Sequence, residues 1–304
     1  MASNERGLGG RALIVLVPYL WLASFFLIPF LIVLKISLSD DVLAQPPYAP
    51  VLDLSKGWEG IREFVAVLDL ENYAFVLGDP LYLYSYLQSV SIAALSTAIL
   101  MLIGYPIAYA MARAPLSLRP ILIMLVILPF WTSFLIRVYA WMGILAREGL
   151  LNQVLVGLGI VSEPVEILAT NSAVVLGIVY SYLPFMVLPL YAALDRLDDS
   201  LLEAAADLGA SPWKSFWLVT FPLSLPGLVA GALLCFIPAV GEFVIPDLLG
   251  GSDTLMIGRT LWTEFFSNRS WSIASVIAVL LLIMLVVPMV LYQNIQARSL
   301  EVGR

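Results

Sequence analysis

Long apolar stretches without charged residues alternate with polar segments along this chain of 304 residues. Six of them can each supply about 20 residues of helix, the length that crosses a hydrocarbon core of about 30 Å. They run over 12–34, 80–112, 120–136, 167–194, 215–241 and 270–297. We expect a spanning helix over each. The third is the shortest, and we expect it to continue past Arg137 toward Leu145, which would place a guanidinium near an interface or inside the bundle.

Composition supports a membrane protein independently of this pattern. Apolar residues make up 61% of the chain and charged residues 12%, and the mean hydropathy is +0.97. A soluble domain is far less apolar, so most of the surface must face lipid or other apolar helices. We therefore expect an all-α integral membrane protein with about six transmembrane helices in one domain, 1–304, whose first outer loop covers about 35–79. The first apolar run exceeds the roughly 7–15 residues of a signal-peptide core, so it is interpreted as a retained anchor.

The distribution of basic residues predicts the orientation in the membrane. With the N-terminus inside, eight basic residues fall on the inner side, in roughly half the loop length that holds the seven outer ones. The inner residues are Arg6, Arg11, Arg113, Arg119, Arg196, Lys214, Arg298 and Arg304. This bias predicts that both termini and the loop at about 195–222 are cytoplasmic.

The outer segments are acidic in this topology. Fifteen carboxylates against seven basic residues leave eight net negative charges there. A field of that sign raises the local concentration of cations and speeds their capture. The alternative is that the carboxylates of the first outer loop only keep an exposed loop solvated.

Residue types that the sequence lacks exclude several kinds of chemistry. There is no histidine, the single cysteine (Cys235) lies inside an apolar stretch, and no cysteine or carboxylate cluster has metal-ligand spacing. Histidine general-base catalysis and zinc sites are therefore excluded. The chain also lacks a G-x-x-x-x-G-K-[ST] phosphate-binding loop. We expect no cofactor on this chain, and any ATP that powers it to be hydrolysed by another polypeptide.

The loop at about 195–222 has the pattern of a helix, a corner and a second helix. Ser200 and Glu203 match a capping box, and Gly209 is suited to stop the helix in the left-handed conformation. Ser211 and Pro212 then match the cap and first turn of a second short helix. The first helix would present Leu201, Leu202, Ala205 and Leu208 on one face, and the second would carry Trp213, Phe216 and Trp217. An ordinary helical connection is the alternative interpretation.

This loop resembles the signature loop of the membrane subunits of binding-protein-dependent ABC importers. The matching residues are Glu203, Ala204, Ala205, Gly209 and the hydrophobic-x-hydrophobic-Pro ending Val219, Thr220, Phe221 and Pro222. Val219 and Phe221 stand where Ile and Leu are usual. The resemblance implies the type I ABC importer permease fold, with a cytoplasmic coupling helix that fits a groove of a separate ATPase subunit and passes its movement to the membrane helices. It places ATP and Mg²⁺ on that partner.

Other segments narrow the resemblance to the polyamine permeases of bacteria. They are 129–141 (PFWTSFLIRVYAW), 241–246 (GEFVIP) and 249–251 (LGG), while 46–48 (PPY) and 256–259 (MIGR) are most similar to the putrescine-type subunit. The resemblance implies an inner-membrane heterodimer with a second homologous permease, an ATPase dimer and a periplasmic polyamine-binding protein, and no nucleic-acid partner. Spermidine, an opine or a ferric complex remain alternative substrates.

Polar and aromatic residues at membrane depth are the candidates for a substrate path. Glu242 is the first of them, because an ionisable group at the end of an apolar helix is costly unless it faces water, a partner or a substrate. The alternative is a structural ion pair with Arg137 or Arg259. Asp247 follows in the same segment.

Aromatic residues extend this set. Trp131, Tyr139 and Trp141 cluster around the outer end of the third stretch, where an interfacial belt is the alternative interpretation. Tyr180 and Tyr182 are expected deeper, where their rings could contact an alkylammonium ion.

Gly227 and Gly231 form a small-residue face on the fifth stretch, which would suit packing against a partner permease. Two other function classes stay open. A secondary transporter or channel would need coupling ions or a pore within this chain, yet we find no internal repeat and few intramembrane carboxylates. A membrane enzyme would need a catalytic constellation, which the absence of histidine disfavours.

Overall fold

The computed structural model describes residues 15–51, 55 and 57–302. It divides into two compact units: residues 1–83 with 261–304 form unit 1, and residues 84–260 form unit 2. The unit boundaries fall within two helices, α5 and α14. The prediction of a single permease domain stays a prediction.

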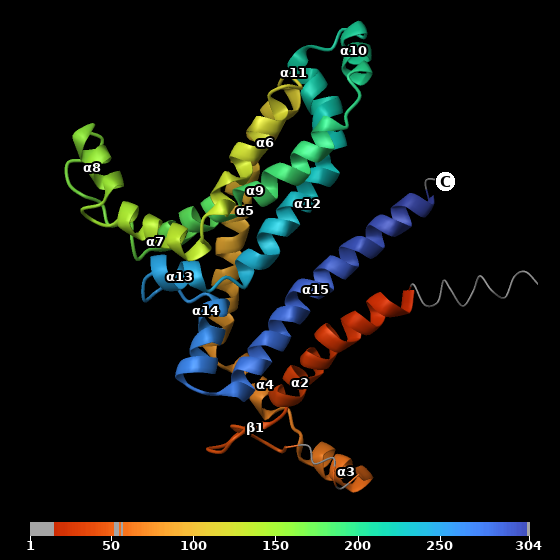
Figure 1. Ribbon diagram of the computed structural model, residues 1–304, viewed down its shortest axis with the longest axis vertical. Coiled ribbons are helices and arrows are strands. Elements are labelled where there is room, and N and C mark those ends of the chain that lie inside the picture. The colour runs from red at the N-terminus through yellow and green to blue at the C-terminus, as the bar shows by residue number, and fades with distance from the viewer. Residues whose placement is uncertain (1–14, 52–54, 56, 303–304) are drawn as a thin grey trace, which may run out of the picture. The chain divides into compact units, whose positions relative to one another are not determined.

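The described elements are mostly helical (Figure 1). In chain order they are η1 (Ala23–Leu27), α2 (Ile28–Ser37), β1 (Asp40–Asp41), β2 (Tyr48–Ala49), α3 (Gly57–Val67), α4 (Glu71–Gly78), α5 (Pro80–Arg113), α6 (Arg119–Ile127), η3 (Leu128–Trp131), α7 (Phe134–Leu145), α8 (Leu150–Gly157), α9 (Asn171–Asp195), α10 (Ser200–Asp207), α11 (Pro212–Ser215), η4 (Phe216–Thr220), α12 (Phe221–Val240), α13 (Val244–Leu249), α14 (Ile257–Trp262), η5 (Thr263–Ser267) and α15 (Trp271–Val302).

The all-α membrane fold that the sequence predicts is confirmed. Four described helices are long and apolar enough to cross a membrane: Val15–Ser37, Pro80–Arg113, Asn171–Asp195 and Pro212–Val240. They match the first, second, fourth and fifth predicted stretches. The sixth stretch lies in α15, whose apolar part is described over Trp271–Val287.

The third stretch continues in helical conformation past Arg137 to Leu145 as predicted, but it is broken into two helices and is not one continuous helix. The helices over Arg119–Trp131 and Phe134–Gly157 are bent by 86° at the break between them. At the break Thr132 is extended, with ψ of 152°, and Ser133 leaves the helical region, with φ of −56° and ψ of 137°. The Pro129 carbonyl accepts the Thr132 amide at 3.4 Å and the Thr132 hydroxyl at 2.9 Å, which closes the turn locally. Both limbs are apolar, so the hydropathy pattern gave no sign of the bend.

Unit 2 is built on the packing of α9 against α12. Met186 of α9 packs directly against a glycine of α12 and a glycine of α5. A Cβ on Gly231 of α12 would be 3.0 Å from the Met186 carbonyl oxygen, and a Cβ on Gly104 of α5 would be 2.7 Å from the Met186 Cγ. A Cβ on Gly227 would be 2.4 Å from that of Ala193. The prediction that Gly227 and Gly231 face a partner permease is therefore wrong, because α9 of the same chain covers both.

In unit 1, α2 packs on α15. The strands β1 and β2 form a two-stranded antiparallel sheet that pairs Asp41 with Tyr48. The Asp41 carboxylate accepts the Ser270 hydroxyl and, at 3.0 Å, the Ser272 amide, which ties this sheet to the start of α15. At the end of α2, Ser37 shares a hydrogen bond of 2.7 Å with the Tyr73 hydroxyl.

Candidate functional site

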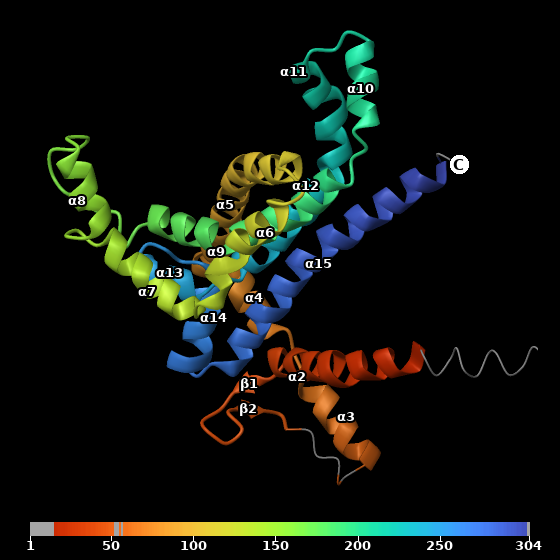
Figure 2. The same cartoon turned by 45° about the horizontal axis from the view of Figure 1, so that its top comes forward.

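The loop between α9 and α12 forms the helix and corner that the sequence predicts. It connects the C-terminal end of α9 to the N-terminal end of α12 (Figures 1 and 2). We call residues 195–222 the coupling loop, after the role that the sequence resemblance implies for it. Its helix α10 ends at Asp207, and Leu208 and then Gly209 follow, with a φ of +78° at Gly209. The Gly209 amide donates to the Ala206 carbonyl at 2.8 Å and the Ala210 amide to the Ala205 carbonyl at 3.0 Å. These two bonds are a Schellman motif, so the predicted left-handed end of the helix is confirmed.

The predicted capping box is wrong. Ser200 is the first residue inside α10 and Asp199 occupies the cap position without a side-chain cap bond. Asp198 provides the local hydrogen bond instead, because its Oδ1 accepts the Ser200 amide at 2.9 Å. This hydrogen bond lowers the pKa of the Asp198 carboxyl. Aspartate before a helix satisfies a free backbone donor as serine does, so the pattern alone could not separate the two registers.

The second helix of the loop begins where the sequence predicts. Ser211 is its cap residue, and its hydroxyl accepts the Lys214 amide at 3.4 Å. It is not a separate short helix, however. The chain runs on through the π-helical turn η4 into α12, so that Pro212–Val240 is one helix. Pro222 lies in the first turn of α12 and has no backbone N–H to donate to the preceding turn. The π-helical turn η4 lies directly before this turn.

The coupling loop presents small and apolar side chains to its surroundings. Glu203 and Ala204 are exposed and Ala205 is half-buried. Leu208 and Trp213, on either side of the corner, are 89% and 70% exposed. Exposed large apolar side chains beside a corner of small residues make a surface suited to a protein partner.

Two ion pairs that hold this loop were not predicted from the sequence. Arg113 at the end of α5 pairs with Asp199, and Arg119 at the start of α6 pairs with Asp195. Both arginines were noted only as markers of orientation. The signal that could have identified the pairs is the presence of aspartates at the start of the loop opposite basic residues of the α5–α6 turn.

Glu242 follows the end of α12 and is buried. Its Oε1 accepts the amides of Phe243, Val244 and Ile245 at 3.2, 3.1 and 3.5 Å, so the carboxylate caps the start of α13. Its Oε2 accepts the Tyr182 hydroxyl at 2.7 Å. An ionised carboxylate offers about four acceptor positions. Each oxygen offers about two of these positions, so Oε2, which among the described residues accepts only the Tyr182 hydroxyl, has one position left for a further donor.

Neither arginine named in the structural alternative forms an ion pair with Glu242 among the described residues. Arg137 is buried, donates to the Pro129 carbonyl at 2.8 Å and lies 5.0 Å from the centre of the Phe130 ring. Arg259 pairs with Asp247, with 3.2 Å between Nε and Oδ1. Asp247, a candidate for the path, is thus held by a cation of its own chain.

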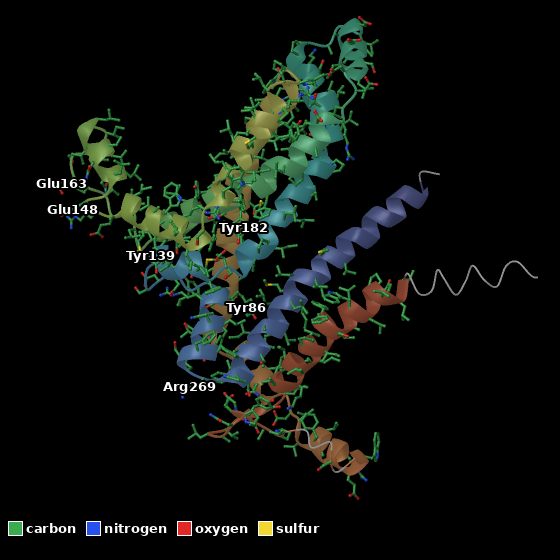
Figure 3. All side chains as sticks on the ribbon, viewed as in Figure 1. Tyr86, Tyr139, Glu148, Glu163, Tyr182 and Arg269 are labelled. Carbon is green, nitrogen blue, oxygen red and sulfur yellow. The ribbon has the colours of Figure 1, made fainter. Side chains whose placement is uncertain are left out.

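The aromatic candidates separate into two groups. Tyr182 lies on α9, where Figure 3 labels it. Of the aromatic candidates it is the one that reaches Glu242, and its ring lies 5.9 Å from that of Phe185. Tyr180 packs edge-on against Trp141 at 5.3 Å. In contrast, Trp131 and Tyr139 are 73% and 54% exposed, as an interfacial or partner-facing position would require. The structure brings together Glu242 and Tyr182 but not the whole predicted set.

Two cavities of unit 2 lie near these residues. An apolar one of about 270 Å³ is lined by Tyr180, Pro129 and residues of α5 and α6. A larger one of about 760 Å³ lies along α5 and α9, with Gln88 and Asn171 as its amide side chains. Glu242 is not among the residues that line either cavity. Among the described residues no group of histidine, cysteine or carboxylate side chains is arranged to hold a metal ion.

Comparison with known proteins identifies the family. Residues 12–301 match the model of the binding-protein-dependent transport system inner membrane component. The spermidine/putrescine transport system permease protein PotB of Haemophilus influenzae is 39% identical over 278 residues, which cover 91% of this chain and 91% of that protein. PotB of Escherichia coli is 42% identical over 226 residues, or 74% of this chain and 82% of that protein.

Solved structures agree on the fold. A chain of the bacterial alginate ABC transporter, in complex with alginate pentasaccharide-bound periplasmic protein, superposes with a TM-score of 0.69 at 15% identity, with 98% of each chain covered. The fold is that of a type I ABC importer permease. Together with the family match, this shows that the chain belongs to the family of inner membrane components of binding-protein-dependent transport systems.

Proposed function

We propose that this chain is a membrane-spanning permease subunit of an ATP-driven importer that moves polyamines, putrescine or spermidine, into the bacterial cytoplasm. The observation that carries the proposal is the 39% identity to a spermidine/putrescine permease over 91% of both chains. The chain acts as a transport subunit and not as an enzyme. Its partners are a second homologous permease, an ATPase dimer that binds ATP and Mg²⁺, and a periplasmic polyamine-binding protein.

The proposed orientation places both termini and the coupling loop in the cytoplasm of a bacterial inner-membrane protein. The basic residues of the inner segments support it. In this orientation an ATPase reaches the exposed Leu208 and Trp213, whereas the inverse topology would remove the coupling loop from any cytoplasmic partner.

Glu242 is proposed as a transient contact for an ammonium group of the substrate. Three amides and Tyr182 already engage the carboxylate, so an arriving ammonium finds one remaining position on Oε2. A carboxylate that is largely satisfied by its own chain binds a cation weakly. Weak binding favours transport, because a site that holds its ion tightly would stall release.

Uptake by the complete complex tests the substrate class. The chain would be produced with its second permease, ATPase and binding protein in cells that lack polyamine uptake, and labelled putrescine and spermidine would be supplied. We expect uptake of the labelled polyamines to require ATP hydrolysis. An excess of an unlabelled opine or ferric complex should not reduce it. Competition by one of those solutes would replace the polyamine assignment, and uptake by the chain alone would replace the importer assignment with a secondary transporter.

Replacing Glu242 with glutamine tests the ammonium contact. In Glu242→Gln the side-chain oxygen still accepts the three amides and the amide nitrogen faces the Tyr182 oxygen, so shape is kept and charge is lost. Hydrogen bonds to charged groups contribute about 1.5–3 kcal/mol, so we expect uptake to fall roughly ten- to a hundredfold with normal subunit abundance. Unchanged uptake across a range of putrescine concentrations would restrict Glu242 to its capping role.

The coupling loop is tested at Gly209. A Cβ there would meet no atom within 4 Å, so the only obstacle to a side chain is the φ of +78°. Gly209→Val should uncouple ATP hydrolysis from uptake, since a left-handed residue costs about 1–2 kcal/mol and a β-branched one more. Gly209→Asn is the matched control, because asparagine tolerates this conformation. Equal uptake by both variants, at equal abundance, would argue against a role for the corner.

A further inference from the structure

We propose that α5 carries the movement of the coupling loop to the segment 251–257, with Arg113 and Tyr109 as the positioning residues at its loop end. The inference rests on the proposed function of the coupling loop. Only α9 and α12 are joined to that loop through the chain. The third helix, α5, is joined to it by side chains alone, and these side chains reach both limbs of the loop.

The first limb, residues 195–200, is bound by arginines on both sides of the α5–α6 turn. Arg113 pairs with Asp199 immediately before α10, and Arg119 pairs with Asp195 at the end of α9. Arg119 also donates from Nε to the Ala114 carbonyl at 2.9 Å, which fixes it to the turn itself. A displacement of this limb therefore pulls on the end of α5 directly.

The second limb, residues 211–222, and the first turn of α12 that follows it contact α5 through aromatic rings and one hydroxyl pair. Phe216 lies edge-on to Tyr105 and Tyr109, with ring centres 5.6 and 5.8 Å apart. The Tyr105 hydroxyl shares a hydrogen bond of 2.8 Å with Ser224. The Arg113 guanidinium lies 5.7 Å from the centre of the Tyr109 ring, so one turn of α5 meets both limbs.

The other end of α5 holds the chain next to the candidate substrate residues. Gln88 accepts the Leu255 amide at 2.9 Å and donates to the Asp253 carbonyl at 3.1 Å, and Ser89 accepts the Ile257 amide at 2.7 Å. The carbonyls of Gly251 and Thr254 in the same segment accept Arg259, the partner of Asp247.

One continuous helix joins these two ends. From Ser89 to Arg113 it rises about 36 Å, at about 1.5 Å for each of its residues. This stretch contains Pro106, and the helix continues through it. A packed helix with polar contacts at both ends of the stretch is a physical route by which two distant sites bias one another. Movement of the coupling loop would thus reach the segment 251–257 without passing through α9 or α12.

The loop end of this route is not needed to stabilise the fold. The side chains of Arg113 and Asp199 are 32% and 74% exposed, and exposed ion pairs contribute little to stability. Their attraction is also screened by salt. Loss of this pair should therefore change the transmission of movement while leaving the amount of folded subunit unaltered.

The test compares Arg113→Gln with Arg147→Gln in the complete complex reconstituted in vesicles. Arg147 lies outside the coupling loop and also forms an exposed ion pair, with 4.0 Å between its Nη1 and Oε1 of Glu166. We expect the number of polyamine molecules moved per ATP to fall about fivefold in Arg113→Gln and to stay unchanged in Arg147→Gln. In the wild-type complex this ratio should also decrease as salt rises, and Arg113→Gln should lose that dependence.

Two further measurements keep the result interpretable. The exchange Arg113→Asp with Asp199→Arg should restore the ratio, which a merely damaged subunit would not show. A single cysteine placed at the exposed Ser252, with the buried Cys235 replaced, should change its reactivity toward a maleimide on ATP binding in the wild-type background but not in Arg113→Gln.

The outcomes separate this inference from the proposed function. A wild-type complex without ATP-driven uptake would overturn the proposed function. If the wild-type complex couples transport to ATP hydrolysis and Arg113→Gln does so equally well, the inference about α5 would be overturned and the proposed function would stand. Reactivity of the Ser252 position that still responds to ATP in that variant would assign transmission to α9 and α12.

Discussion

Two buried glutamates, one in each unit, are hydrogen-bonded to tyrosines but differ in what else they contact. Glu242 and Glu264 are each 9% exposed. Glu242 accepts Tyr182 at 2.7 Å and three backbone amides at the start of α13. Glu264 lies in the π-helical turn η5 and accepts two side chains, the Tyr82 hydroxyl at 3.0 Å and the Asn268 amide at 2.9 Å.

The difference shows that burial and a tyrosine partner do not define the role of a carboxylate. The charge of Glu242 is stabilised by the backbone, so the side chain also fixes where α12 ends and α13 begins. The carboxylate of Glu264 is stabilised by hydrogen bonds from two side chains, Tyr82 and Asn268, and each of these bonds can be removed by a single substitution. Loss of Glu242 should therefore disturb the chain path, and loss of Glu264 should disturb a local contact.

The largest effect is expected for Glu242→Ala. The change removes a helix cap and leaves the Tyr182 hydroxyl without its acceptor, which together should cost about 2–4 kcal/mol of stability. Thermal unfolding of the purified complex in detergent measures it. Glu242→Gln is the control and should remain close to wild type in stability. An equal loss in both variants would show that the charge, and not the cap, stabilises this region.

A smaller loss of about 1–3 kcal/mol is expected for Glu264→Ala, because two side-chain donors lose their acceptor while no helix loses its cap. The same unfolding assay applies, with Glu264→Gln as control. If Glu264→Ala proved more destabilising than Glu242→Ala, the contrast drawn between backbone and side-chain stabilisation would be wrong.

The smallest effects are expected when each tyrosine loses only its hydroxyl. Tyr82→Phe should cost about 1 kcal/mol and Tyr182→Phe less, because Glu242 keeps its amide donors while Glu264 keeps, among the described residues, only the Asn268 side chain. Tyr180→Phe, two residues from Tyr182 on the same helix, is the control. A larger loss in Tyr182→Phe than in Tyr82→Phe would contradict the order predicted here.

The sequence predicted the features that depend on local chemistry. Gly209 is left-handed and Ser211 caps a helix, because both properties are set by a residue and its near neighbours. Four of the apolar stretches form continuous spanning helices, since hydrophobic length alone determines them.

Features that depend on distant partners were not predictable in the same way. The contact between Glu242 and Tyr182 joins residues 60 positions apart, and the alternatives named from the sequence were two arginines with other partners. Gly227 and Gly231 do form a packing face, but a pattern of small residues does not say which helix covers it. Here that helix is α9.

The bend between η3 and α7 has a consequence for biosynthesis. The limb over Arg119–Trp131 is about 20 Å long at about 1.5 Å per residue, too short to cross a hydrocarbon core of about 30 Å by itself. It packs against α9, where Phe130 meets Phe185 with ring centres 5.3 Å apart. Because α9 is synthesised later, this limb acquires its packing partner only after it has itself left the ribosome.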